Sequence, residues 1–187
     1  THWNVEYCNE DIKDVYHELF DDALKRYNDK QTRKDRKIDD YYEKIRSGKQ
    51  EKLFHEVILQ IGDKDNMGSE TVEGQLAAKI LDEYMRGFQE RNPTLRVFAA
   101  HLHLDEATPH LHIDFIPYVT GSKRGLDTRV SLKQALSSLG FKGGSRSETE
   151  LNQWVQSEKE KLAMVMRGNE IEWDQKGTHE QHLSVLD

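Results

Sequence analysis

The chain has 187 residues, of which 27 are Lys or Arg and 34 are Asp or Glu, so its formal net charge is −7. This length suits one domain with a substantial core, and the acidic balance argues against a general nucleic-acid binder unless the basic residues are segregated. No apolar run approaches the roughly 18 residues of a membrane span, and no signal peptide is visible. Cys8 is the single cysteine and cannot form an internal disulfide, so we expect a cytoplasmic protein.

The first part of the chain predicts helices and a charged segment. Apolar residues recur at helical spacing over residues 12–27, and either Asn9 or Asp11 can cap the start of that helix. Residues 29–40 carry mostly charged side chains, which indicates a solvent-facing connection or an exposed helix. A short helix over residues 39–46 follows.

The middle of the chain predicts strands on either side of one long amphipathic helix. Residues 53–61 alternate in polarity and are rich in β-formers, so we expect a strand, followed by a loop over 62–69. The clearest amphipathic helix covers 71–90. Two strands, 95–104 and 110–119, come next and are joined by a turn.

The last part is predicted to be helical again. Residues 121–129 form a basic loop, after which two capping-box patterns open helices. These patterns begin at Ser131 and Ser147, and the helices are expected to end at Gly140 and Gly168.

Together these elements predict an α+β fold, in which an antiparallel β-sheet is flanked by α-helices. We expect residues 1–187 to form a single domain with a less regular C-terminal tail, 169–187. Since the chain starts at Thr1 rather than at a methionine, we also expect upstream residues that would add further strands.

A histidine-rich segment follows the long helix. It reads His101-Leu102-His103-Leu104-Asp105-Glu106-Ala107-Thr108-Pro109-His110-Leu111-His112. In a strand, residues i and i+2 point to the same face, so each His-Leu-His triplet places two imidazoles on one side. The segment between the triplets indicates a turn, so the two strands should fold back on each other and bring the imidazoles together.

These imidazoles form a candidate divalent-metal site. A tight hairpin pairs the positions nearest its turn first, so His103, His110 and His112 are the best three ligands. Three imidazoles leave coordination positions open, which suits a catalytic ion that polarises a phosphoryl oxygen. Glu106, on the turn, could complete the coordination or act as a general base. The alternatives are histidines that are merely polar, and a structural metal site without a reaction.

Three further polar residues share the face of the proposed ligands. His101 lies roughly 6–7 Å along its strand from His103, at about 3.3 Å per residue, and is expected to contact a ligand or the substrate rather than the ion. Asp114 is placed to orient one ligand imidazole through its other ring nitrogen. Asp105 lies on the same face of the first strand.

The hairpin resembles the signature motif of a known family. The matching string is His103-x-Asp105-Glu106-x-x-Pro109-His110-x-His112. The family is that of the Mob/Pre, or MobV-type, plasmid mobilisation relaxases, within the superfamily of HUH endonucleases. That superfamily is named for a His-hydrophobe-His strand, which corresponds to residues 110–112. The order of strand, long helix, strand and hairpin also fits, and the resemblance is clearest over residues 53–119.

The resemblance implies a DNA relaxase. Such enzymes nick one strand at the origin of transfer of a mobile element by transesterification, stay joined to the 5′ phosphate and later rejoin the ends. It also implies an antiparallel sheet flanked by helices, a bacterial cytoplasmic setting, and Mn²⁺ or Mg²⁺ bound by His103, His110 and His112. Glu106 is then an acidic residue of the motif that either takes part in catalysis or contacts the ligands. A replication initiator, a transposase, a nucleophile-less origin-binding module and a small-molecule metallohydrolase are the alternatives.

In this family the attacking residue is expected near the N-terminus. Thr1-x-x-Asn4 resembles the end of an N-terminal element, so we expect the nucleophile, a tyrosine or a histidine, upstream of Thr1. The candidates within the chain are His2, Tyr41 and Tyr42. The two adjacent tyrosines would point about 100° apart on a helix, so packing is the favoured interpretation for both.

Two basic segments are expected to follow the phosphate backbone of a single-stranded or hairpin origin DNA. Such contacts supply salt-dependent affinity rather than sequence choice. The residues are Arg33, Lys34, Arg36 and Lys37 in the first segment and Lys123, Arg124 and Arg129 in the second.

Overall fold

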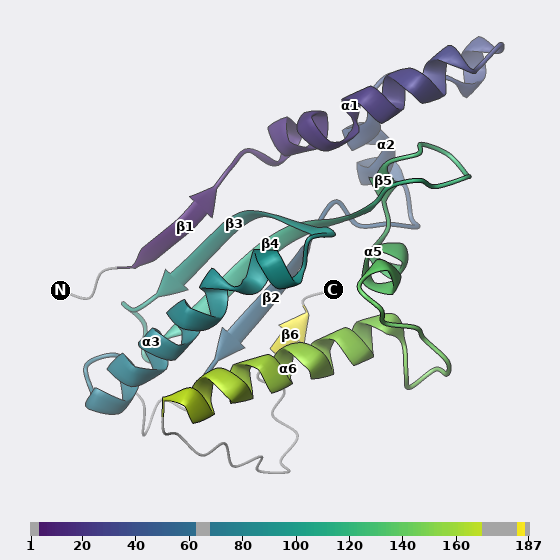
Figure 1. Ribbon diagram of the computed structural model, residues 1–187. Helices are drawn as coiled ribbons and strands as arrows, with labels where there is room; N and C mark the ends of the chain where they lie inside the picture. The colour runs from purple at the N-terminus through teal and green to yellow at the C-terminus, as the bar shows by residue number, and fades with distance from the viewer. Residues whose placement is uncertain (1–3, 63–67, 170–182, 186–187) are drawn as a thin grey trace.

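Figure 1 shows the computed structural model of the chain, in which residues 4–62, 68–169 and 183–185 are described. An antiparallel sheet lies at the centre with helices packed on it, which confirms the predicted α+β fold. No helix within the described residues is long and apolar enough to cross a membrane.

The strands are β1 (Val5–Asn9), β2 (His55–Gln60), β3 (Leu95–His103), β4 (His110–Val119), β5 (Arg129–Val130) and β6 (Leu183–Val185). The helices are α1 (Ile12–Asp29), α2 (Tyr41–Ser47), α3 (Val72–Arg86), α4 (Phe88–Arg91), α5 (Leu132–Ser138) and α6 (Glu150–Gly168), and a 3-10 helix, η1, spans Lys34–Arg36.

Neighbouring strands of the sheet run in the order β1-β3-β4-β2-β6, and β5 pairs with the end of β4. Every one of these pairings is antiparallel. β4 lies between β3 and β2, so its side chains have neighbours on both sides. The two strands of the histidine hairpin therefore form the middle of the sheet, with β2 beside them.

One face of the sheet is covered by α3 and α6, as Figure 1 shows. Alternate residues of β4, Leu111, Ile113 and Phe115, are at most 1% exposed and belong to the same core as Tyr84 of α3 and Trp154 of α6. Because strand side chains alternate between faces, this core directs the remaining residues of β4 to the opposite face.

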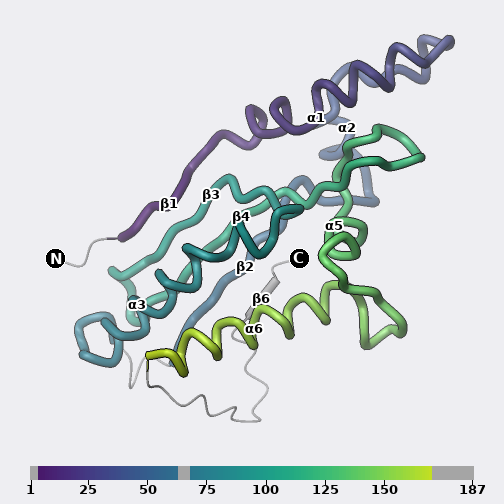
Figure 2. The backbone as a smooth tube through the Cα atoms, in the orientation of Figure 1, coloured from purple at the N-terminus to yellow at the C-terminus, as the bar shows by residue number. Residues whose placement is uncertain are grey.

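Among the described residues, the opposite face is covered only at one end. There α1 and α2 pack Phe20 and Tyr41 against Phe98 of β3 and Ile116 of β4. Figure 2 shows α1 leading away from the sheet beyond the end of β1, so it does not extend over the β3–β4 turn. Residues 110 and 112 share the face of Ile116 but lie nearer the turn, where they are half-buried.

Two helix boundaries differ from the sequence prediction. The helix expected over 71–90 is divided at Gly87, whose backbone N–H donates to the Tyr84 carbonyl oxygen at 3.3 Å before the chain starts a new turn. Glycine weakens a continuous helix, because it loses more conformational freedom there than residues with a side chain. The last helix is capped by Thr149, whose hydroxyl accepts from the Asn152 N–H, rather than by the predicted box at Ser147.

Three strands were not predicted. β1 holds five residues, β5 two and β6 three, and such short segments show little alternation. β6 pairs with β2 and lies in the tail that was predicted to be less regular. The other positions of that tail after residue 169, like positions 63–67 of the predicted loop, lie outside the described residues.

Candidate metal centre

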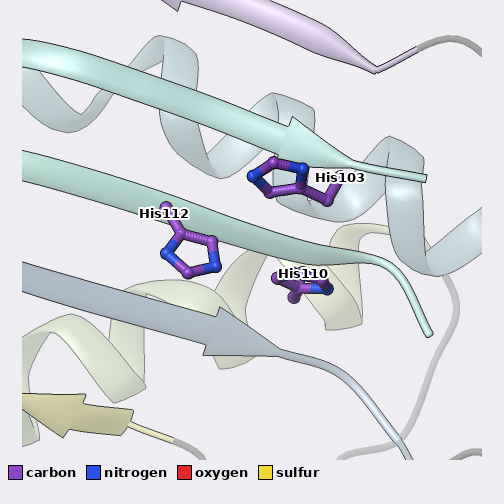
Figure 3. A group of neighbouring side chains, drawn as sticks. All are labelled: His103, His110 and His112. Atoms are coloured by element: carbon purple, nitrogen blue, oxygen red, sulfur yellow. The ribbon is translucent and has the colours of Figure 1, made fainter. Parts of the chain in front are cut away.

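The β3–β4 hairpin brings three histidines together. His103 and His110 are Cα partners in the hairpin register. One ring nitrogen from each of His103, His110 and His112 lies within 4.8 Å of the other two, and the ring centroids are 5.0 to 5.2 Å apart. Figure 3 shows the three rings gathered near the ends of the strands. We call these residues the histidine trio, and their spacing suits the ligands of one ion.

Hydrogen bonds hold two rings of the trio. Nδ1 of His110 lies 3.0 Å from the carbonyl oxygen of Thr108, and Nδ1 of His112 lies 2.5 Å from Oε1 of Glu56. A carbonyl and a carboxylate accept hydrogen bonds, so the neutral rings carry their proton on Nδ1. The lone pair is then on Nε2, which leaves that atom of each ring as the metal donor.

The third ring is also favoured in its neutral form. Burial and the neighbouring His110 and His112 lower the pKa of His103 below the usual value for an imidazole. A lower pKa reduces the protonated fraction at neutral pH. The His103 lone pair is therefore more available to a cation than that of an isolated, exposed histidine.

Glu56 of β2 occupies the orienting position that the sequence assigned to Asp114. The two carboxylates are Cα partners across β2 and β4, but Glu56 is the one that bonds His112. Oδ1 of Asp114 is buried without a hydrogen-bond partner among the described residues. Burial, together with the charge of Glu56, raises the pKa of Asp114 to about 6.

Sequence reasoning missed Glu56 because its role depends on the pairing of two strands that are far apart in the chain. The available signal was the alternation in β2, which places Glu56, Ile58 and Gln60 on the face opposite its core. This alternation predicts that Glu56 is on the partly exposed face, but it does not predict which residue of β4 lies beside it.

His101 lies next to the trio rather than within it. Its Nε2 is 3.2 Å from Oε2 of Glu6 on β1, and its ring centroid is 6.2 Å from that of His103. Its place one step further along the strand agrees with the spacing argued from the sequence.

Asn4, the residue before β1, is attached to the hairpin turn. Oδ1 of Asn4 accepts a hydrogen bond from the Leu104 N–H at 2.8 Å. Asn4 also hydrogen-bonds Asp105, which keeps the pKa of that carboxyl below its usual value. The chain therefore enters β1 beside the turn that carries the predicted ligands.

Glu106 lies on the turn at the open side of the trio. Its carboxylate is exposed, and Oε2 is 3.7 Å from Nε2 of His110. Its backbone carbonyl accepts a hydrogen bond from the Ser69 hydroxyl at 2.7 Å, so the loop before α3 supports the turn. Glu106 is thus placed to reach a group bound at the trio.

The two tyrosines that were candidate nucleophiles do not join this site. Tyr41 is a core residue that contacts Phe20, and its hydroxyl accepts from the Val130 N–H at 3.0 Å. Tyr42 packs edge-on against Tyr16. Both lie on α2, at the other end of the sheet from the trio (Figure 1). His2 lies outside the described residues.

The predicted DNA-binding residues lie away from the trio. The first segment, residues 33–37, surrounds η1 beyond the end of α1, and Arg33 pairs there with Asp35. The second segment contains Lys123, Arg124 and Arg129 and follows the end of β4. At about 3.3 Å per residue, the length of β4 separates this segment from His110 by roughly 30 Å. An ion pair between Arg26 of α1 and Asp127 joins α1 to this loop.

The donor set of the trio fits a divalent metal ion. The three rings are half-buried, their nitrogens converge, and the tautomers of two rings are fixed by acceptors. Three protein ligands leave positions open for a substrate.

The fold and the site define an α+β protein that carries a candidate metal centre on the face of an antiparallel sheet opposite α3 and α6. The chain belongs to the Mob_Pre family, described as plasmid recombination enzyme, whose sequence profile matches residues 1–183. This confirms the family predicted from the hairpin motif and extends it over nearly the whole chain. The family description indicates an enzyme that acts on plasmid DNA. Comparisons with curated proteins and with solved structures gave no match.

Proposed function

We propose that the chain is a metal-dependent relaxase that nicks one strand of plasmid DNA at an origin of transfer and later rejoins it. The histidine trio is the observation that supports this proposal most directly, because its donors converge within 4.8 Å of one another on an open sheet face. Membership of a plasmid recombination family supplies the substrate class.

In this proposal His103, His110 and His112 hold Mn²⁺ or Mg²⁺. The nitrogen donors favour Mn²⁺ of the two, since Mg²⁺ prefers a shell of oxygen ligands. When bound, the ion supplies Lewis-acid polarisation of a phosphoryl oxygen. Glu56 and the Thr108 carbonyl keep the His112 and His110 rings in the ligating orientation. His101, Asp105 and Asp114 surround these ligands.

The proposed reaction is a transesterification. The nucleophile forms a bond to phosphorus, the bond from phosphorus to the 3′ oxygen breaks, and that oxygen leaves with a proton. The 5′ phosphate stays on the protein, and rejoining reverses these steps. Glu106 is proposed to accept the proton of the nucleophile, because it is exposed beside Nε2 of His110.

We place the nucleophile before Asn4, either at His2 or upstream of Thr1. The support is the attachment of Asn4, the first described residue, to the hairpin turn beside the trio. Tyr41, by contrast, is enclosed in the core beside α1.

The test mixes the chain, and a version extended at its N-terminus, with a labelled single-stranded oligonucleotide that carries the origin of transfer, in the presence of Mn²⁺. Denaturing gels are read for nicking and for a protein–DNA adduct. We expect nicking by the extended version, its loss on His110→Ala, and no loss on His17→Ala, which changes an exposed histidine of α1. Absence of nicking and of DNA binding by both versions over a range of salt concentrations would contradict the proposal.

A further inference from the structure

A hollow of about 450 Å³ lies between α2 and the start of β2. This volume falls in the range of small-ligand sites, which is about 300–1,000 Å³. Its lining includes Arg46, Glu51, Lys52, Leu53, Phe54 and Glu56. We call it the α2–β2 hollow.

Glu56 connects this hollow to the metal centre. Its side chain lines the hollow and also bonds Nδ1 of His112. Ile58 is the Cα partner of His112, so its side chain lies on the face of the trio. Because every second residue points to the same face, Glu56 and Phe54 lie on that face too. Phe54 lies roughly 13 Å along the chain from Ile58, at about 3.3 Å per residue. A DNA strand whose phosphate is held at the trio would span this distance with no more than about four nucleotides, at about 3.4 Å each.

Phe54 has the properties of a stacking platform. It is one of the few large apolar side chains of the described residues that are exposed, at 38%. Its ring is nevertheless held by an edge-to-face contact with Phe98, with centroids 5.4 Å apart. An aromatic ring that is exposed and fixed can stack a nucleobase at little entropic cost.

The lining of the hollow carries both signs of charge. Arg46 and Lys52 lie there with the carboxylates Glu51 and Glu56, and Arg46 pairs with Glu43 at 2.7 Å. The ring of Phe54, rather than the net charge of the lining, is therefore the feature that suits a nucleobase, and the two cations are near enough to contact the phosphate that follows it.

We propose that the α2–β2 hollow binds a nucleobase of the single strand, stacked on Phe54, within about four nucleotides of the phosphate held at the histidine trio. This inference rests on the proposed function, since the trio must hold that phosphate. It adds a DNA contact at a place that contains none of the basic residues predicted from the sequence.

The test measures binding of a fluorescently labelled strand of 20 thymidines to the full chain with Mn²⁺, by anisotropy. Phe54→Ala and Phe54→Leu should weaken binding on the order of tenfold, because base–aromatic stacking contributes that much per base. Phe54→Trp should bind at least as well as the unchanged chain. Met164→Ala is the matched control, since Met164 is an exposed apolar residue of α6.

Two further measurements separate stacking from structural damage. The Mn²⁺ affinity of Phe54→Leu, measured by titration calorimetry, should equal that of the unchanged chain. The dependence of DNA affinity on salt should also keep its slope, because stacking on Phe54 neutralises no phosphate.

Equal DNA binding by Phe54→Leu and the unchanged chain would overturn the inference and leave the relaxase proposal standing. So would a loss of Mn²⁺ affinity as large as the loss of DNA affinity. Failure of the unchanged chain to bind the thymidine strand with Mn²⁺ would also overturn the inference, whereas the relaxase proposal is decided separately by the origin oligonucleotide.

Discussion

At the scale of single residues, the acceptors behind the trio decide which imidazole nitrogens face a metal. The Thr108 carbonyl is local to His110, whereas Glu56 reaches His112 from another strand. A carboxylate that accepts from Nδ1–H also raises the basicity of the ligand, so it strengthens the metal bond as well as orienting the ring. Glu56 should therefore matter to the ion although it is not a ligand.

Replacing Glu56 should weaken Mn²⁺ binding. We expect Glu56→Ala to lower the affinity by about 10- to 100-fold, and Glu56→Gln by less, because the amide oxygen still accepts a hydrogen bond. Titration calorimetry with Mn²⁺ measures the change. Glu6→Ala is the control, since Glu6 meets His101 rather than a member of the trio. Unchanged affinity in Glu56→Ala would show that the hydrogen bond has no part in metal binding.

Tyr41→Phe distinguishes a packing residue from a nucleophile. The change leaves the buried Val130 N–H without its acceptor, which costs about 1–3 kcal/mol of unfolding free energy. Because Tyr41 lies in the core, the nicking activity of the N-terminally extended chain should persist. Chemical denaturation measures the first effect, and the origin-nicking gel measures the second. A stable variant that no longer forms the adduct would instead identify Tyr41 as the nucleophile.

At the scale of the elements, the hairpin turn is supported by the loop that opens α3. Ser69 bonds the Glu106 carbonyl, and Thr71 caps α3 through the Gly74 N–H. Gly74 makes this close approach possible, because a Cβ there would lie 2.0 Å from the Gly68 carbonyl oxygen.

Gly74→Ala should therefore be destabilising. The contact is with backbone atoms that cannot rotate away, so we expect a loss of about 1–3 kcal/mol or more. The midpoint of thermal unfolding should fall accordingly. Gly144→Ala is the control, because a Cβ at Gly144 meets nothing within 4 Å. Equal midpoints for the two variants would mean that the loop moves freely to accept the methyl group.

A buried ion pair joins α6 to α3 and α4. Glu158, at 4% exposure, accepts from Tyr84, Arg91 and Asn92. Glu158→Ala leaves the Arg91 guanidinium without its partner, and the loss of a buried partner costs about 3–5 kcal/mol. Urea denaturation should show this loss, and Glu160→Ala, an exposed change on the same helix, should show almost none. A small effect of Glu158→Ala would mean that water replaces the carboxylate.

The elements that the sequence could predict are those with a strong local pattern. The helices follow from apolar periodicity, and the histidine hairpin follows from two i, i+2 triplets around a turn. The sequence did not predict β1, β5 and β6, because their residues pair with distant strands and show little pattern of their own. It did not predict the role of Glu56 or the α2–β2 hollow either, since both depend on how β2 aligns with its neighbours.

At the scale of the whole molecule, the two faces of the sheet are covered to different extents by the part of the chain that the structure describes. α3 and α6 cover the first face, while α1 and α2 cover only the end of the second. Within residues 4–62, 68–169 and 183–185, this leaves the trio uncovered on the side of the hairpin and β2. The ion, if it binds as proposed, would link β3 to β4 and stabilise the folded sheet.

Mn²⁺ should consequently raise the resistance of the chain to unfolding. A ligand that binds only the folded state adds about 2.7 kcal/mol at a concentration 100 times its dissociation constant. The thermal midpoint should rise with Mn²⁺ and return on addition of EDTA, and His110→Ala should abolish the rise. A midpoint that does not respond to Mn²⁺ would indicate that the trio holds no ion in the folded protein.

The attachment of Asn4 to the hairpin has a consequence for handling the protein. The hydrogen bond to the Leu104 N–H fixes the start of β1 beside the trio. An affinity tag of consecutive histidines would offer competing imidazoles to the same ion. A tag at the other end of the chain is no safer by this criterion, because Ser184 of β6 pairs with Ile58, the Cα partner of His112. Metal titrations of a tagged protein would count tag sites together with the native one, so the tag should be removed before the metal is measured.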